Sequence, residues 1–197
     1  MFVGGSSMGS RSRGTEETLR YQVVEKHLAD RGYEVRRYAP ILCAETARHP
    51  SEQGSTEAFF RLARYIGVVS RPENVGAGGK PEAVAMTAPV MHTEGRMMFT
   101  MPSKYKRLES VPRPTNPDLA LREIPAFEAA VFPYSGYTSE SDAQRKLAEF
   151  LKRLKPDHAN RVVKNRSGKI QFAWNAYDPP SVPAAMRTNE ICIWLGR

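Results

Sequence analysis

Cysteine and histidine are the residue types in this sequence that most readily act as nucleophiles, general bases or metal ligands. The 197 residues include two cysteines and four histidines. Cys43 and Cys192 both lie in apolar, strand-like segments, and two cysteines without a spacing pattern form neither a zinc motif nor a disulfide framework. A reducing compartment is therefore expected. Because no acid, base or open metal motif is assembled in the sequence, it indicates binding rather than catalysis, and we expect no enzymatic activity.

One predicted helix carries the residues best suited to binding. The segment Gly54-Ser55-Thr56-Glu57 is typical of a helix start, and Gly67 and Pro72 predict the helix end. Helical periodicity places four apolar side chains on one face: Phe59, Leu62, Ala63 and Ile66. This face can line a binding groove, or it can be the side of the helix that is buried in the core.

Strand and helix patterns occur in the same order twice along the chain. Alternation of apolar and polar residues predicts strands over residues 21–26, 33–38 and 41–47 before this helix, and over 84–92 and 96–101 after it. The second half has strands over 119–124 and 129–134, a helix over 140–154, and strands over 170–176 and 190–195. The proline-rich segment 111–117 connects the halves, since each proline removes a backbone donor.

This order predicts an α+β fold, namely a distorted antiparallel β-barrel with two flanking helices. The barrel would be built as a pseudo-twofold repeat of a strand-helix-strand-strand unit. We expect a single domain over residues 19–197, with repeats over about 19–110 and 118–197. Residues 1–18 are expected to form a flexible tail, because the first 14 positions are rich in Gly, Ser and Arg.

The composition favours a soluble protein with anionic partners. Lys and Arg number 29 against 21 Asp and Glu, which gives a formal net charge of +8. Five cations make the second predicted helix basic: Arg145, Lys146, Lys152, Arg153 and Lys155. They suggest an acidic protein partner, although a solvated helix face explains them equally well. No apolar run approaches the roughly 20 residues of a membrane helix, and no helix-turn-helix pattern precedes the domain. We expect a cytoplasmic monomer, with a plastid as the alternative location, and no nucleic-acid partner.

Seven short segments carry a resemblance that covers nearly the whole chain. They are Tyr33–Tyr38, Arg64–Gly67, Met86–Val90, Met101–Tyr105, Leu121–Pro125, Tyr177–Pro180 and Arg187–Ile191. In this order they resemble the SOUL/haem-binding protein family. The resemblance implies a distorted antiparallel barrel with two helices. It also implies a carrier of tetrapyrroles, here b-type haem held without covalent bonds or protoporphyrin IX, in an apolar groove against the first helix.

The resemblance assigns ten residues to the ligand: Phe59, Arg61, Leu62, Ala63, Arg64, Ile66, Met86, Val182, Met186 and Arg187. The apolar residues of the first helix would form one wall, and the loop after residue 178 would form the second. Arg61 and Arg64 would pair with the propionates of the ring, or would simply be solvated. Family members can carry a lysine at the position of Val182, so Arg187 would have to supply that positive charge here.

The iron ligand proposed for some family members has no counterpart in this sequence, because Arg37 stands where they have a histidine. His49, in the loop before the first helix, is the best replacement as a metal ligand, and His92 is the second candidate. The leading hypothesis is a reversible carrier or buffer of tetrapyrroles. The alternatives are a protein-interaction or regulatory module with incidental tetrapyrrole binding and, third, a haem-modifying enzyme.

Overall fold

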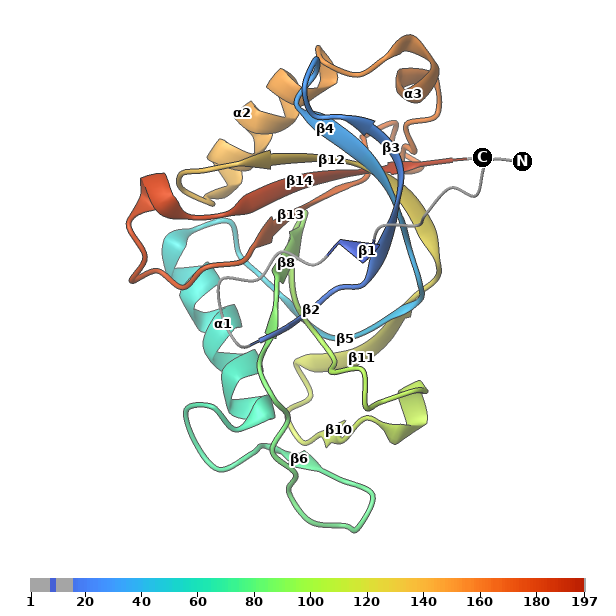
Figure 1. Cartoon of the computed structure of the whole chain (residues 1–197). Coiled ribbons are helices and arrows are strands. Elements are labelled where there is room, and N and C mark those ends of the chain that lie inside the picture. Colours follow the sequence, from blue (N-terminus) through green and yellow to red (C-terminus); the bar gives the residue numbers. More distant parts are fainter. Residues whose placement is uncertain (1–7, 10–15, 197) are drawn as a thin grey trace, which may run out of the picture. The chain divides into compact units, whose positions relative to one another are not determined.

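The computed structural model describes residues 8–9 and 16–196, which divide into two units (Figure 1). The terminal unit comprises residues 8–9, 19–39 and 126–196, and the central unit comprises residues 16–18 and 40–125. Most of the predicted N-terminal tail lies outside the described residues. Its described part forms two short strands, β1 (Met8–Gly9) in the terminal unit and β2 (Glu17–Thr18) in the central unit.

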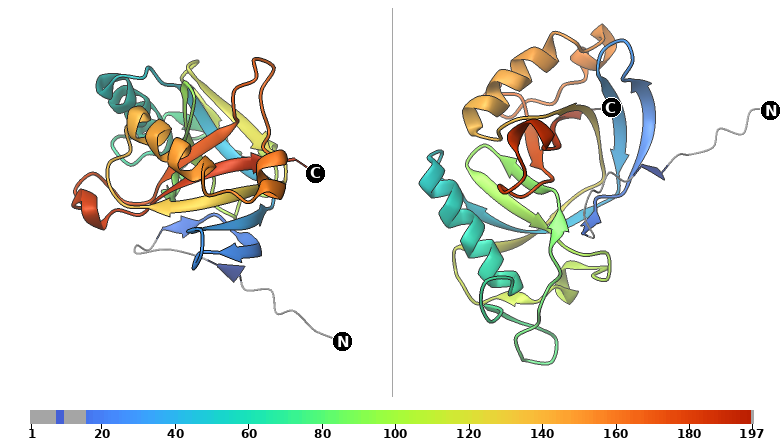
Figure 2. Two further views of the ribbon diagram at one scale, coloured as in Figure 1. Left: turned by 90° about the horizontal axis from the view of Figure 1, so that it is seen from above. Right: turned by 60° about the vertical axis from the view of Figure 1, so that its left-hand side comes forward.

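The central unit packs one helix on an antiparallel sheet. The sheet strands, in spatial order, are β8 (Val90–Thr93), β9 (Arg96–Thr100), β5 (Ile41–Ala47) and β11 (Leu119–Ile124). Helix α1 (Glu52–Ile66) follows β5 and crosses one face of these strands (Figure 2). The smaller elements are β6 (Asn74–Val75) paired with β10 (Arg113–Pro114), β2 parallel to β7 (Thr87–Ala88), and the 3-10 helix η1 (Leu108–Ser110).

Both ends of α1 follow from its sequence. Ser51 is the N-cap residue, and its hydroxyl accepts a hydrogen bond from the backbone N–H of Gly54 at 3.0 Å. Gly67 ends the helix with a φ of 86°, and its N–H is directed at the carbonyl oxygens of Ala63 and Arg64. A residue with a side chain is strained at such a φ, so glycine is the favoured residue there. The predicted helix is therefore confirmed.

The inner face of α1 forms much of the core of the central unit. Leu62, Tyr65 and Ile66 are almost completely buried and pack with Met97 and Phe99 of β9. Burial of a large apolar side chain contributes about 1.5–3 kcal/mol relative to an exposed one. This packing fixes the rotation of α1 about its axis and so decides which side chains face outward.

The terminal unit combines the N-terminal hairpin with the C-terminal strands. Its strands, in spatial order after β1, are β3 (Tyr21–His27), β4 (Tyr33–Tyr38), β12 (Phe127–Tyr134), β14 (Asn189–Leu195) and β13 (Phe172–Ala176). Helix α2 (Glu140–Leu151) crosses one face of them (Figure 2), and the short helices α3 (Pro156–Asn160) and η2 (Ala184–Met186) follow. Leu147 and Phe150 of α2 pack into the core with Phe132, Trp174 and Ile191.

The two units repeat one strand order, which confirms the predicted α+β fold and its internal repeat. The order is β8-β9-β5-β11 in the central unit and β13-β14-β12-β4 in the terminal unit, each with a helix after its third strand. The pairing, however, crosses the predicted repeats. Strand β4 pairs with β12, and β11 pairs with β5. The first two strands of the first predicted repeat, β3 and β4, therefore belong to the terminal unit, and β11, the first strand of the second predicted repeat, belongs to the central unit. The units thus do not coincide with the predicted boundary near residues 110–118.

The second helix differs from its predicted extent. The sequence predicts a helix over residues 140–154, whereas α2 ends at Leu151 and a separate helix, α3, begins at Pro156. Proline has no backbone N–H and cannot continue a helix, but it suits the first helical position. Leu154, between the two helices, is still buried in the core.

A buried charge network connects β4 to β14 in the terminal unit. The Arg36 side chain, only 1% exposed, donates from Nε to Glu34 Oε1 at 2.6 Å, and its other two guanidinium nitrogens lie 2.9 and 3.0 Å from the Glu190 carboxylate oxygens. Tyr177 donates its hydroxyl to Glu190 at 2.7 Å. Burial alone would lower the pKa of Arg36, but the Glu190 carboxylate raises it above its ordinary value. Arg36 therefore stays charged in the core.

Both cysteines, Cys43 and Cys192, are free and buried. Burial, with a smaller contribution from Glu45, raises the pKa of Cys43 to about 12, so its thiol is not a nucleophile at neutral pH. Among the described residues, no helix is both long enough and apolar enough to cross a membrane.

Candidate functional site

The outward face of α1 contains a hollow of about 280 Å³, lined by Thr56, Glu57, Phe60, Arg61 and Arg64. These residues recur at intervals of three to four, so they form one continuous side of the helix. Phe60 is 41% exposed, which is unusual for a phenylalanine. The hollow thus combines an exposed aromatic ring with two guanidinium groups and one carboxylate.

The two arginines of the hollow differ in how they are held. Arg61 is half-buried and donates a hydrogen bond from its guanidinium group to the backbone oxygen of Ala47 at 2.7 Å. Arg64 is exposed. Glu57, the carboxylate of the hollow, accepts a hydrogen bond from the side chain of Gln53 at 3.0 Å. One cation is therefore oriented by the protein, and the other faces solvent from the last turn of α1.

The four apolar residues predicted as the ligand wall point toward the protein core. Leu62 is 0% exposed, Ala63 1% and Ile66 2%. Phe59 is half-buried, and its ring packs edge-on against Phe99 with the ring centroids 5.4 Å apart. The structure thus places these side chains on the inner face of α1, as in the core interpretation of this helix.

The sequence interpretation missed Phe60, together with Thr56 and Glu57, among the residues that line the hollow. Phe60 follows Phe59 directly, and the periodic assignment of Phe59 to the apolar face puts its neighbour on a different side of the helix. An aromatic residue outside the apolar stripe was the available signal in the sequence.

Met86, predicted to line the same cavity, belongs to the central unit. It is half-buried and packs against the core cluster that includes Leu62 and Ile66. The structure therefore brings Met86 and Phe59 to one core, and Arg61 and Arg64 to the outward hollow.

The predicted second wall lies in the terminal unit, where Arg187 organises its own loop. Arg187 donates to the backbone oxygen of Val182 at 2.8 Å and to that of Pro180 at 2.6 Å. Met186 is 55% exposed, and the exposed ring of Tyr137 lies 5.9 Å from the Arg187 guanidinium carbon. Arg187 therefore holds this loop in shape while Met186 and Tyr137 face solvent.

His49, the predicted metal ligand, is exposed just before α1. Its Nδ1 accepts a hydrogen bond from the backbone N–H of Ser51 at 3.3 Å and lies 3.2 Å from the Ser51 hydroxyl. Gly54 allows this loop to pack on the first turn of the helix, since a Cβ at Gly54 would lie 2.5 Å from the His49 Cβ. Burial, with Arg48 as the second cause, lowers the pKa of His92 to about 3, so the imidazole of His92 is neutral at physiological pH.

Comparisons with known proteins assign the family. The model of the SOUL heme-binding protein family matches residues 16–194. Heme-binding protein 1 of Xenopus tropicalis is 26% identical over 172 residues, which cover 81% of this chain and 81% of that protein. The solved structure of EcmrR in complex with DNA has a TM-score of 0.52 at 11% identity, over 84% of this chain and 57% of that chain, and this likeness concerns the fold alone. Because the family model spans most of its residues, the chain belongs to the SOUL heme-binding protein family.

Proposed function

We propose that this protein reversibly binds haem or protoporphyrin IX, without covalent attachment, as a carrier or buffer. The proposed site is the outward face of α1. The observation that carries the proposal is the exposed ring of Phe60 beside Arg61 and Arg64 in one hollow. Membership of the family supports a tetrapyrrole as the ligand.

The donor set of the hollow fits the two kinds of surface on a tetrapyrrole. The ring is a flat apolar disc, and Phe60 offers an aromatic side chain for it to contact. The propionates lie together on one edge, where a guanidinium group can make two parallel hydrogen bonds to each carboxylate. Arg64 lies one helical turn after Phe60, and Arg61 directly follows Phe60 in the sequence. Both cations therefore lie on the same side of α1 as the aromatic ring.

The size of the hollow supports reversible binding. Its volume of about 280 Å³ is slightly below the roughly 300–1,000 Å³ of ligand pockets. It would therefore receive part of the ring and leave the remainder in solvent. The protein would gain less apolar contact than an enclosing pocket provides, which suits a carrier that must release its ligand.

The ring can be held in this mode without a bond to iron. None of the residues that line the hollow is a histidine, cysteine or tyrosine. Bound haem would supply an iron centre, while the side chains of α1 would hold and orient the ring. His49, which precedes α1 and is not among the residues that line the hollow, would add a bond to iron in the haem complex only. No catalytic role is proposed for the hollow.

The remaining predicted ligand residues take supporting roles in this proposal. Leu62, Ala63 and Ile66 anchor α1 from inside, together with Phe59 and Met86. A second wall of the ligand site, formed by Val182, Met186 and Arg187, remains a prediction. In such a wall, the exposed side chain of Met186 would provide the apolar contact to the ring.

A paired titration tests the site on α1. Purified protein is titrated with ferric haem and, separately, with protoporphyrin IX, and binding is followed by absorbance and by quenching of tryptophan fluorescence. Phe60→Ala and Arg64→Gln are each expected to weaken binding of both rings by roughly five- to tenfold, equivalent to about 1–1.4 kcal/mol. Phe59→Ala, which alters the inner face, and Arg145→Gln, which removes an exposed arginine of α2, are the matched controls.

Each outcome of this titration has a defined meaning. Unchanged affinity in the Phe60→Ala/Arg64→Gln double variant would refute the outward site, and a larger loss in Phe59→Ala than in Phe60→Ala would favour the inner face. Absence of saturable binding of either ring to the unmodified protein would refute the function itself. In His49→Ala, loss of only the iron-dependent spectrum would identify the axial ligand.

An acidic protein partner is a second and weaker proposal. Three cations of the predicted second helix are already paired with acids of α2: Arg145 with Asp142 at 2.7 Å, and Lys146 and Arg153 with Glu149 at 2.9 and 2.7 Å. A partner would have to compete with these pairs. Capture of the partner by a Phe60→Ala/Arg64→Gln variant that no longer binds tetrapyrrole would support the interaction module.

A further inference from the structure

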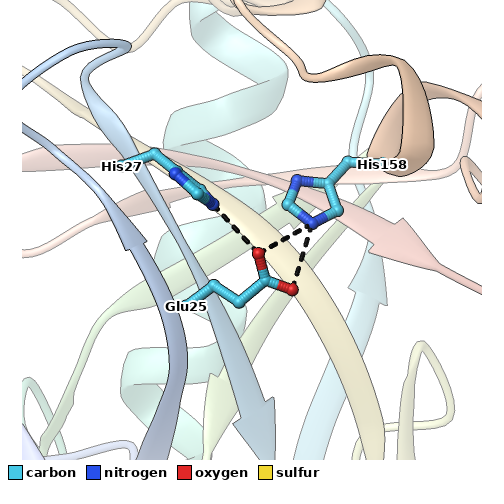
Figure 3. A group of neighbouring side chains, drawn as sticks. All are labelled: Glu25, His27 and His158. Carbon is cyan, nitrogen blue, oxygen red and sulfur yellow. Dashed lines mark hydrogen bonds and ion pairs between the residues drawn. The ribbon is translucent and has the colours of Figure 1, made fainter.

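Three potential metal ligands, Glu25, His27 and His158, lie close together in the terminal unit. Glu25 and His27 alternate on β3, which places their side chains on one face of the strand, and His158 lies on α3 (Figure 3). His27 Nε2 lies 3.0 Å from the Glu25 carboxylate, and His158 Nε2 lies 3.3 Å from it. All three ligand atoms are within 4.8 Å of one another.

These separations match those of ligand atoms around a zinc ion. Zinc binds histidine nitrogen and carboxylate oxygen at about 2.0–2.2 Å, so two neighbouring ligand atoms of a tetrahedral site lie about 3.3 Å apart. The two nitrogen-to-oxygen distances already have this value within a few tenths of an ångström. All three ligand atoms lie within 4.8 Å of one another, and both imidazole rings face the same carboxylate (Figure 3).

The surroundings hold His158 in the orientation that a ligand needs. Its Nδ1 lies 2.7 Å from the Tyr33 hydroxyl, which also accepts a hydrogen bond from the backbone N–H of Lys155 at 3.2 Å. A hydrogen bond to the second ring nitrogen is the usual support of a metal-bound histidine. It directs Nε2 of His158 toward Glu25, and Tyr33 itself lies opposite His27 in the β3–β4 pair.

The exposure of the three side chains leaves an entry path. The His158 side chain is 5% exposed and that of His27 is 11% exposed, whereas that of Glu25 is 42% exposed. The two imidazoles are thus sheltered from solvent, while the carboxylate borders it. A metal ion could enter beside Glu25 and keep a water molecule in its remaining coordination position.

We propose that Glu25, His27 and His158 bind a divalent transition-metal ion of the zinc class and so fasten α3 to β3. Two imidazoles and one carboxylate form a ligand set that suits zinc and is poorly suited to calcium or magnesium, which prefer oxygen ligands throughout. On binding, each imidazole presents its Nε2 lone pair to the ion. The proton of His158 is then on Nδ1, and this N–H donates a hydrogen bond to the Tyr33 hydroxyl oxygen. This site is independent of the tetrapyrrole proposal.

Zinc titration of chelator-treated protein, in the absence of tetrapyrrole, tests the proposal. Calorimetry or competition with a chromophoric chelator should show one zinc ion per chain. His27→Gln and Glu25→Gln should each weaken the affinity at least tenfold, since each removes one of three ligands. Glu123→Gln is the matched control, because it removes an exposed carboxylate of the central unit. Its zinc affinity should equal that of the unmodified protein.

Cobalt(II) supplies a second readout that does not depend on stability. A cobalt ion with two imidazoles and a carboxylate should give a visible absorption spectrum that His27→Gln alters and Glu123→Gln leaves unchanged. Binding of zinc to His27→Gln with the affinity of the unmodified protein would overturn the proposal. So would the absence of stoichiometric binding, which would mean that the three side chains only hydrogen-bond to one another. Loss of tetrapyrrole binding in the α1 variants, with zinc binding intact, would separate the two sites.

Discussion

Replacement of Arg36 by methionine should strongly destabilise the terminal unit. The change keeps the length of the apolar stem but removes the cation between two buried carboxylates, Glu34 and Glu190, whose side chains are 7% and 1% exposed. Removing one partner of a buried ion pair costs about 3–5 kcal/mol, because the remaining charge stays desolvated. Since Arg36 serves two carboxylates, we expect the upper part of this range. A domain of ordinary stability, about 5–15 kcal/mol, would lose a large fraction of it.

The assay is urea-induced unfolding at neutral pH, followed by tryptophan fluorescence. Both tryptophans of the chain, Trp174 and Trp194, lie in the terminal unit, so their fluorescence reports on that unit. Arg37→Met is the matched control. Arg37 neighbours Arg36 on β4, its side chain is 56% exposed, and its ion pair with Glu128 should be worth at most about 1 kcal/mol.

A small effect would refute this reasoning. If Arg36→Met lowers the free energy of unfolding by less than about 1 kcal/mol, or by no more than Arg37→Met does, then the buried network is not a stabilising requirement of the folded state. A cation at this position would then serve another purpose.

Three further predictions concern stability. Gly54→Ala should lower the free energy of unfolding by about 1–3 kcal/mol despite the better helix propensity of alanine. The reason is steric, because the new Cβ would lie 2.5 Å from the His49 Cβ and 2.7 Å from the His49 carbonyl oxygen. Equal or higher stability of the variant in thermal unfolding would contradict this prediction. Ser139→Ala should cost about 1 kcal/mol, since the hydroxyl caps α2 by accepting the N–H of Asp142 at 3.1 Å, and Ser139→Asp, which keeps a capping oxygen, should restore most of it. The pKa of His92 is about 3 in the folded protein and near 6.5 when unfolded, so unfolding takes up a proton between these values and stability falls as pH falls through that window. His92→Gln should reduce this slope by up to about 1.4 kcal/mol per pH unit, and identical slopes in urea unfolding from pH 7 to pH 4 would exclude the effect.

Local patterns in the sequence predicted the elements well. The end of α1 at Gly67 was predicted, whereas the helix begins at Glu52, two residues before the predicted start at Gly54. The alternating residues of β3 and β4 predict these two strands. The repeated order of strands and helices gave the α+β class. Each of these features depends on residues that are close together in the sequence, which is the range over which such patterns carry information.

Pairing and burial between distant segments were not predictable in this way. No local pattern shows that β4, which pairs with β3 on one edge, pairs with β12 of the other predicted repeat on its second edge. An arginine such as Arg36 is normally expected to face solvent. It is buried here because Glu190, far along the chain, supplies its counter-charge. His158 approaches Glu25 for the same reason, since the fold brings α3 to β3.

The exchange of strands between the repeats has a consequence for how the protein is made. Synthesis proceeds from the N-terminus, and residues 40–125 of the central unit can fold as a continuous segment once they have emerged. Strand β4 is made earlier, yet one of its edges stays without its partner until residues 127–134 follow. An unpaired edge invites aggregation, and charged side chains are a common protection against it. In the nascent chain, the charges of Glu34 and Arg36 would keep the unpaired edge of β4 hydrated. Once β14 has been made, Glu190 pairs with Arg36 and the same charges become the buried network of the folded unit.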